Sequence, residues 1–174
     1  MSATSTGDMM DLRWQRFWIR DWQPGDRQLA AAIIKQVLLE YGLPWEPEGA
    51  DAEIFQIEDF YWQRGGEFWV IEQDGVLVGT AAYQPLQRDQ SAVEIRKMYL
   101  LPAVRGKGLG KYLLQKLEQA IAAKGYQSIC IETASILKEA VQLYENNGYQ
   151  PITEIETARC DLAYIKHLSD VKNS

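Results

Sequence analysis

The sequence predicts an α/β (α+β) domain with a mixed, mostly antiparallel, twisted sheet of about six to seven strands and helices on both faces. Two observations predict this class. Asp74-Gly75 lies between two β-rich runs and is a strong hairpin signal, which requires antiparallel strands. Later segments read strand, helix, strand, which requires crossover connections. The hairpins distinguish this pattern from the strict alternation of a doubly wound fold.

The first third of the chain carries local signals for one strand and one long helix. Residues 16–20 alternate like a strand, and Asp26 is placed to cap the following helix. Apolar residues then recur every four positions, until Gly42 stops the helix and Pro44 forbids its continuation. The acidic stretch 45–66 is expected to form a loop and a short helix.

The rest of the chain alternates between β-rich and helical patterns. Pro102 closes one strand, and a helix that follows a glycine-rich turn stops near Gly125. Ser135 is expected to cap the last helix, which Asn147-Gly148 ends. The expected strands are 67–73, 76–86, 91–101, 126–133, 149–153 and 158–165, and the expected helices are 109–124 and 135–147.

Length and composition indicate one globular domain. The 174 residues fit a single domain, expected at residues 13–168 after a flexible tail at 1–12. No run approaches the roughly 18 apolar residues of a membrane span, and the first 17 residues lack the apolar region of a secretory signal. Cys130 and Cys160 lie in apolar, strand-like runs and are expected to pack as inert hydrophobes. We therefore expect a cytoplasmic protein with no membrane partner.

The charge of the chain is unevenly distributed. The net charge of −6 argues against general nucleic-acid binding, which needs a basic face. Between Glu94 and Glu118, however, six cations and two anions give +4, which leaves −10 for the rest. The sequence shows no cluster of metal-ligand residues, so no metal is expected. Positive charge is concentrated around one glycine-rich turn.

The stretch "VRGKGLGKYLL" at residues 104–114 combines glycines and cations where a helix begins. The first N–H groups of a helix have no internal partners and bind anions, and glycine lets phosphate oxygens approach the main chain. The ATPase phosphate loop requires Gly-Lys-Ser/Thr, which is absent, and Lys111 breaks the G-x-G-x-x-G dinucleotide pattern. The alternative is a glycine-rich turn between a strand and a helix that binds no anion and whose cations only face solvent.

Residues 105–110 match R/Q-x-x-G-x-G/A, the pyrophosphate loop of the GCN5-related N-acetyltransferase (GNAT) superfamily. The segment "VEIRKMYLLPAVRGKGLGKYLLQKLEQA" resembles motif A of that family, and "AVQLYENNGYQPI" resembles its motif B. On the basis of these two segments, the chain resembles members of that superfamily. The resemblance implies its acyl-CoA N-acyltransferase fold.

The resemblance also implies a reaction and a cofactor site. Acetyl-CoA would be the co-substrate, without a metal, and a primary amine of a small molecule or amino acid would attack it directly, without a covalent acyl-enzyme. The main chain of Met98 and Leu100 matches the bulged strand that pairs with pantetheine. The positions that match the pyrophosphate loop are Arg105, Gly106, Lys107, Gly108, Leu109, Gly110 and Lys111.

Two residues match catalytic positions of the family. Glu94 is the expected base, or else the ion-pair partner of Arg96 on the same strand face. Tyr144 matches the motif B tyrosine that protonates or positions the sulfur of CoA, or else it is a core aromatic on a helix face. Many members carry an asparagine seven residues earlier, where this chain has Leu137.

Other functions stay open at this point. The acceptor could be a protein or peptide amine, or the chain could be a non-catalytic acyl-CoA-binding module. A homodimer is expected only because dimers are common among similar proteins. Acidic and aromatic side chains between residues 41 and 62 either bind a cationic amine or form a solvated acidic face.

Overall fold

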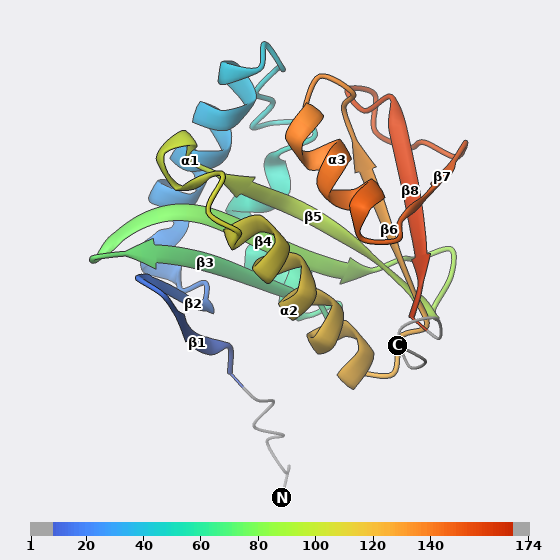
Figure 1. Ribbon diagram of the computed structural model, residues 1–174, viewed down its shortest axis with the longest axis horizontal. Coiled ribbons are helices and arrows are strands. Elements are labelled where there is room, and N and C mark those ends of the chain that lie inside the picture. The colour runs from blue at the N-terminus through green and yellow to red at the C-terminus, as the bar shows by residue number, and fades with distance from the viewer. Residues whose placement is uncertain (1–8, 169–174) are drawn as a thin grey trace, which may run out of the picture.

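One mixed sheet organises the protein, and the computed structural model describes residues 9–168 of it. The sheet has eight strands in the order β1-β2-β3-β4-β5-β6-β8-β7. Figure 1 shows the strands fanning from β1 to β7. The strands are β1 (Asp11–Trp14), β2 (Phe17–Asp21), β3 (Glu67–Gln73), β4 (Val76–Pro85), β5 (Ala92–Leu100), β6 (Ser128–Thr133), β7 (Gln150–Ile152) and β8 (Leu162–His167).

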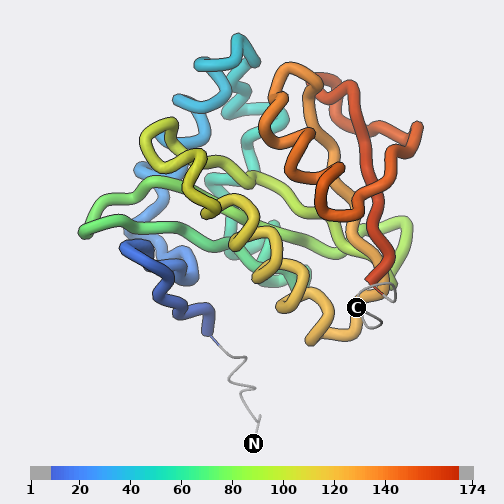
Figure 2. Tube along the Cα trace, in the orientation of Figure 1, coloured from blue at the N-terminus to red at the C-terminus, as the bar shows by residue number. Residues whose placement is uncertain are grey.

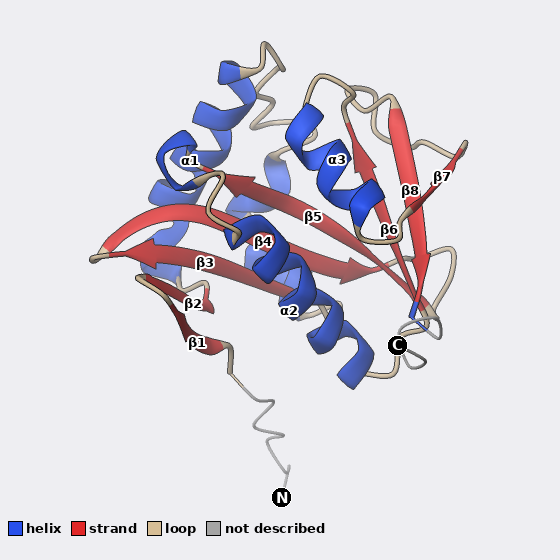
Figure 3. Ribbon diagram, in the orientation of Figure 1, coloured by secondary structure: helices blue, strands red, loops and turns tan. Residues whose placement is uncertain are grey.

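Helices cover both faces of the sheet, as predicted (Figure 3). On one face α2 and α3 pack over the larger apolar core, and on the other face α1 packs with two short helices, η2 and η3. No helix among residues 9–168 has the length and apolar character needed to cross a membrane. The helices are η1 (Pro24–Asp26), α1 (Arg27–Glu40), η2 (Ala52–Phe55), η3 (Glu58–Trp62), η4 (Pro102–Val104), α2 (Leu109–Ala123) and α3 (Lys138–Asn146).

The strand pairing confirms the mixed, mostly antiparallel sheet. All neighbouring strands are antiparallel except β5 and β6. The β3–β4 hairpin turns at Asp74 and Gly75, whose φ angles are 51° and 80°. Positive φ at both central residues is what a type I′ turn requires, so the hairpin signal predicted this turn correctly.

The sheet has one strand more than the upper bound of the sequence prediction. β1 lies partly in the stretch expected to be a tail, and it pairs with β2 from Asp11 to Trp14. The tight turn between these strands contains Gln15 at φ 53°, a conformation usually taken by glycine or asparagine. Without such a turn residue, the sequence carries no hairpin signal there.

The predicted start of the last helix is wrong. α3 begins at Lys138, with Leu137 as its N-cap residue, rather than at Ser135. The Ser135 hydroxyl instead donates a 2.6 Å hydrogen bond to Asp161, whose carboxylate also accepts the Ser135 N–H at 2.7 Å. Ser135 therefore ties the segment before α3 to the chain entering β8.

β5 and β6 form the only parallel pair of the described sheet, and they pair over a short length. Their register runs from Ala92 and Ser128 to Ile95 and Ile131, and beyond it the strands part (Figure 2). β5 also contains a bulge against β4, because Thr80 pairs with Tyr99 but Ala82 pairs with Arg96. Two residues, 97 and 98, thus lie opposite one residue of β4.

Gly66 lies at the entry to β3, where two stretches of backbone pass closely. A Cβ at this position would overlap the carbonyl oxygen of Tyr83 and lie 3.0 Å from the Cα of Gln84. Gly66→Ala is therefore expected to lower the free energy of unfolding by about 1–3 kcal/mol, as measured by urea unfolding. Gly25→Ala is the control, since a Cβ there meets no atom within 4 Å. Equal stability of the two variants would contradict this account.

Candidate active site

A cavity of about 330 Å³ opens where β5 and β6 part. Its walls come from α1, the second half of β5, the glycine-rich turn, β6 with α3, and the loop between β7 and β8. Segments that are distant in sequence therefore meet around one space. The predicted site residues in its lining are Met98, Leu100, Arg105, Gly106, Gly108, Gly110, Lys111 and Tyr144.

Three predicted site residues lie outside this lining. Lys107 is exposed in the turn, and Leu109, the first residue of α2, is buried in the apolar core. Glu94 lines a smaller adjoining cavity of about 50 Å³, which shares several wall residues with the first.

The glycine-rich turn has the conformation that its sequence indicates. Gly106 and Gly108 have φ angles of 74° and 83°, and Gly108 is the N-cap residue of α2. A Cβ at Gly106 would meet no atom within 4 Å. The turn therefore presents open main chain at the N-terminus of a 15-residue helix, a site suited to anions.

Arg105 stabilises this turn through contacts within the protein, and its positive charge is already paired. Its guanidinium forms an ion pair with both carboxylate oxygens of Glu40 on α1, and also donates to the Tyr41 hydroxyl at 3.1 Å. Its Nε donates to the carbonyl of Leu100 at 2.9 Å. Because Glu40 neutralises Arg105, the unpaired cations of the turn among the described residues are Lys107 and Lys111.

The second half of β5 supplies main-chain groups to the cavity. Met98 and Leu100 line it and also contact the apolar core under α2 and α3. On the side facing β6, residues 96–100 have no strand partner among the described residues, since the β5–β6 register ends at Ile95. Main-chain groups that a regular sheet would satisfy are thus left at the cavity wall.

Tyr144 reaches the cavity from α3. It is 5% exposed, and its ring packs against those of Tyr149 and Tyr164. Burial, followed by the neighbouring Tyr99 and Cys160, raises the pKa of Tyr144 above its ordinary value. The phenol is therefore protonated at neutral pH and can donate a hydrogen bond into the cavity.

Glu94 is both buried and ion-paired. Its carboxylate accepts a 2.8 Å hydrogen bond from Arg96, the partner that the strand spacing indicates. Burial raises the pKa of the Glu94 carboxyl, while Arg96 opposes the shift and Glu132 adds to it. Glu132 lies on β6 in the wall of both cavities, and its carboxylate accepts the N–H of Thr157 at 3.1 Å.

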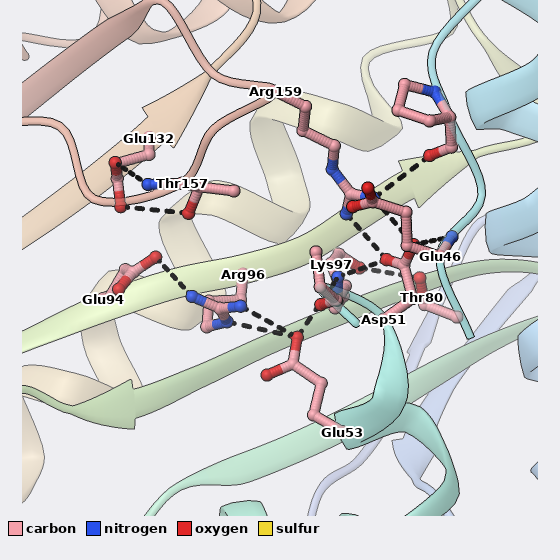
Figure 4. Close-up of polar contacts among 12 residues, drawn as sticks. Glu46, Asp51, Glu53, Thr80, Glu94, Arg96, Lys97, Glu132, Thr157 and Arg159 are labelled. Carbon is pink, nitrogen blue, oxygen red and sulfur yellow. Dashed lines mark hydrogen bonds and ion pairs between the residues drawn. The ribbon is translucent and has the colours of Figure 1, made fainter. Parts of the chain in front are cut away.

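A chain of buried opposite charges runs beside these cavities (Figure 4). It starts at Glu94 and Arg96 and ends at the β7–β8 loop. The successive contacts are Arg96 to Glu53 at 3.0 Å, Lys97 to Glu53 at 3.2 Å, Lys97 to Asp51 at 2.7 Å, and Arg159 to Asp51 at 2.6 Å.

This network corrects the sequence interpretation of the acidic stretch. Asp51 and Glu53 do not form a solvated acidic face, because both are buried. They are also not left to bind a cationic ligand, because each forms an ion pair with a cation of the protein itself. Arginine and lysine together lower the pKa of Asp51 to about 2, although burial alone would raise it. The adjacent cations Arg96 and Lys97 in an otherwise alternating strand were the one signal for this arrangement.

Cys160 also differs from expectation. It lies in the loop before β8, is only partly buried, and lines both cavities, whereas Cys130 is buried as predicted. Burial raises the pKa of the Cys160 thiol to about 11, so the thiol is protonated at neutral pH and is a poor nucleophile. The predicted strand over residues 158–165 is wrong at its start, because β8 begins at Leu162 and leaves Arg159 and Cys160 in a loop that reaches the cavities. Glu132 lies on β6 as predicted, but its cavity position depends on the parting of β5 and β6, which no local pattern indicates.

Comparison with known proteins identifies relatives of this chain by sequence. The uncharacterized N-acetyltransferase YjgM of Escherichia coli K12 is 40% identical over 131 residues, which cover 73% of this chain and 78% of YjgM. N-acetylaspartate synthetase of Xenopus tropicalis is 31% identical over 105 residues, which cover 60% of this chain and 38% of that protein.

Solved structures share the fold. A GNAT-family acetyltransferase from Staphylococcus aureus Mu50 superposes with a TM-score of 0.81 at 20% identity, over 87% of this chain and 99% of that chain. Spermidine N-acetyltransferase from Vibrio cholerae, solved with CoA and spermine, gives a TM-score of 0.68 at 16% identity, over 91% of this chain and 99% of that chain.

The family model described as the acetyltransferase (GNAT) family matches residues 31–149. This match extends from α1 through the glycine-rich turn to Tyr149, so it includes most of the walls of the larger cavity. The chain belongs to the GNAT family of acetyltransferases.

Proposed function

We propose that the protein transfers the acetyl group of acetyl-CoA to a primary amine of a small molecule or amino acid, by direct attack and without a covalent acyl-enzyme. One observation carries the proposal: a single cavity joins the open glycine-rich turn, the stretch of β5 beyond its pairing with β6, and the hydroxyl-bearing Tyr144. These are an anion site, a row of main-chain hydrogen-bonding groups and a proton donor.

The residues at the cavity suit the parts of CoA. The N–H groups of the turn from Gly106 to Gly110 would bind the pyrophosphate, with Lys107 and Lys111 adding positive charge. The main chain of Met98 and Leu100 would pair with the pantetheine amides. Leu137 lines the cavity where many family members have asparagine, so it contributes an apolar contact there. Bound acetyl-CoA supplies the activated acyl group.

The amine needs to lose a proton before it attacks. An alkylamine with a pKa near 10.4 is neutral at pH 7 to the extent of only about one part in a thousand. Glu94 is our candidate base, because burial raises the pKa of its carboxyl toward the useful range and because it lines the smaller cavity. Its contact with Arg96 holds the carboxylate in one orientation.

Tyr144 would act at the other end of the reaction. When the new C–N bond has formed and the C–S bond breaks, the departing thiolate needs a proton. The raised pKa of Tyr144 keeps its phenol protonated but makes it a weaker acid, so we propose that it first positions the sulfur by hydrogen bonding and then donates the proton.

The smaller cavity favours a cationic acceptor. Three cations, Arg96, Lys97 and Arg159, face four acids, and each cation is paired with at least one of them. Among residues 9–168, Glu132 has no ion-pair partner, so its carboxylate in the cavity wall is left for an ammonium group. The Vibrio cholerae structure is named a spermidine N-acetyltransferase and was solved with spermine, a polycationic amine. The four acids are Asp51, Glu53, Glu94 and Glu132, of which Glu94 and Glu132 line the smaller cavity and Asp51 and Glu53 are buried against its cations.

The function is tested by acetyl-CoA binding and turnover. At about 100 times its Kd, acetyl-CoA is expected to raise the melting temperature by about 5–10 °C. CoA-thiol release is then measured with spermine, L-aspartate, L-lysine and an alanine-initiated peptide. Stabilisation without release from any amine would favour a non-catalytic module, and release from the peptide alone would favour a protein acetyltransferase. No stabilisation would contradict the proposal.

Gly106→Ala tests the turn as the binding site. It is expected to weaken acetyl-CoA binding about tenfold or more, because the added Cβ projects into open space at the cavity. Gly125→Ala is the matched control: this glycine also has positive φ and an open Cβ position, but it lies beyond the end of α2. Both variants should lose similar stability, and only the first should lose affinity in calorimetry. Equal affinities would exclude the turn as the pyrophosphate site.

Tyr144→Phe tests the hydroxyl. The variant is expected to lower kcat about 100-fold with little change in the KM for acetyl-CoA, because only the proton donor is removed. Tyr149→Phe is the control, since this neighbouring buried tyrosine has a hydroxyl without a hydrogen-bond partner among residues 9–168 but does not line the cavity. Steady-state CoA release measures both, and equal rates would assign Tyr144 to packing alone.

Glu94→Gln separates the base from the ion-pair partner. A base acts when deprotonated, so activity should fall as pH drops through the raised pKa of Glu94, and the variant should lose both this acidic limb and about 100-fold in rate. Glu58→Gln is the control for the substitution itself, because it removes a 2.8 Å contact with Arg27 that is more exposed and lies away from the cavities. An unchanged pH–rate profile together with lower stability would leave Glu94 a structural role.

A further inference from the structure

We infer that the buried Lys97–Asp51 ion pair sets the bulge in β5 and thereby positions the main chain of this strand for acetyl transfer. Lys97 is then a positioning residue, which acts through the backbone and not by contact with substrate. The inference rests on the proposed function, because the bulge matters only if the β5 main chain holds the acyl donor.

The side chains of β5 show what the bulge does. Val93 and Ile95 pack in the core under α2 and α3, and so do Met98 and Leu100. The alternation therefore slips by one residue between Ile95 and Met98. In a regular strand Lys97 would follow Ile95 onto that apolar face.

The slip places two consecutive cations on the opposite face. Arg96 and Lys97 both reach η2, where they meet Glu53 and Asp51. A lysine that entered the apolar core without a partner would be strongly disfavoured, so its charge selects the bulged register. The sequence "IRKM" thus encodes the irregularity through its charges.

The local backbone shows that the bulge is held under constraint. Lys97 has a φ of 51°, a value that side-chain-bearing residues seldom adopt. Its Nζ lies 2.7 Å from Asp51 Oδ1 and 3.2 Å from Glu53 Oε1, and its side chain is 3% exposed. The Thr80 hydroxyl donates a 2.7 Å hydrogen bond to the Lys97 carbonyl. These contacts fix both the side chain and the carbonyl at the bulge.

Asp51 is an anchor that does not depend on Lys97 alone. Both of its oxygens accept hydrogen bonds from Arg159, each at 2.6 Å, and Oδ2 also accepts the N–H of Glu46 at 2.9 Å. The carboxylate is fully buried and stays charged down to a pH of about 2. Removing the lysine side chain would therefore leave Asp51 paired with Arg159. A buried charge would then no longer hold β5 in the bulged register.

A matched pair of variants tests the inference. Lys97→Ala and Lys97→Gly both delete the ammonium group, but only glycine adopts positive φ readily. The assay uses acetyl-CoA and whichever of the four acceptors tested above releases CoA fastest. Lys97→Ala is expected to lower kcat about 100-fold, because an alanine side chain can face the apolar core and so permits the regular register of β5. Lys97→Gly should retain a kcat within about tenfold of the wild type.

An acceptor-free readout follows the bulge itself. The chain has four methionines, so ¹⁵N-methionine labelling gives few amide signals, and Met98 is identified by its loss in Met98→Leu. In the wild type and in Lys97→Gly, acetyl-CoA alone should shift the Met98 amide signal. In Lys97→Ala this signal should start at another position and respond less.

The outcomes are distinct. Equal loss of kcat in both variants would overturn the inference in favour of a direct electrostatic role of the ammonium group. Wild-type kcat in Lys97→Ala would reduce Lys97 to a stabilising residue. If Lys97→Ala does not fold, Lys97→Gly still decides, because a 100-fold loss in that variant contradicts a backbone role. Failure of the proposed function would show in the wild type, which would then neither bind acetyl-CoA nor release CoA.

Discussion

The early end of the β5–β6 pairing is the constraint on which the rest of the structure depends. The two strands share four register pairs and then diverge, although β5 continues to Leu100 and β6 to Thr133. Unpaired main chain inside a protein is costly unless something satisfies it. Each strand remains paired on its other side, because β5 pairs with β4 and β6 pairs with β8. The space between the strands is therefore a stable feature and not a packing defect.

Charge is buried on one side of this space and exposed on the other. At the glycine-rich turn Lys107 and Lys111 are exposed, whereas Arg105 is committed to Glu40. Beside the smaller cavity, Lys97 and Asp51 are almost completely buried. Breaking a buried pair by removing one partner is far more disruptive than removing an exposed charge. The site thus combines a rigid charged frame with a solvated rim.

The sequence predicted the parts of the structure that depend on local pattern. The Asp74-Gly75 hairpin, the helices α1 and α2 and the glycine-rich turn follow from short segments, and all are present as predicted. β1 was missed because its turn uses Gln15 at positive φ, which no sequence pattern signals. The roles of Asp51 and Arg159 were missed for a different reason: each charge is explained only by a partner far along the chain. Local patterns do not contain that information.

One distance along the chain has a consequence for folding. Asp51 and Arg159 are 108 positions apart, and their contact ties the β7–β8 loop to the segment before η2. Contacts of such long sequence separation form only after a large loop has been ordered, so they are among the slower events in folding. During synthesis, the anchor of the β5 bulge therefore stays incomplete until the segment that leads into β8 has left the ribosome. A chain that stops short of this segment would lack Arg159, one of the two cations that pair with Asp51.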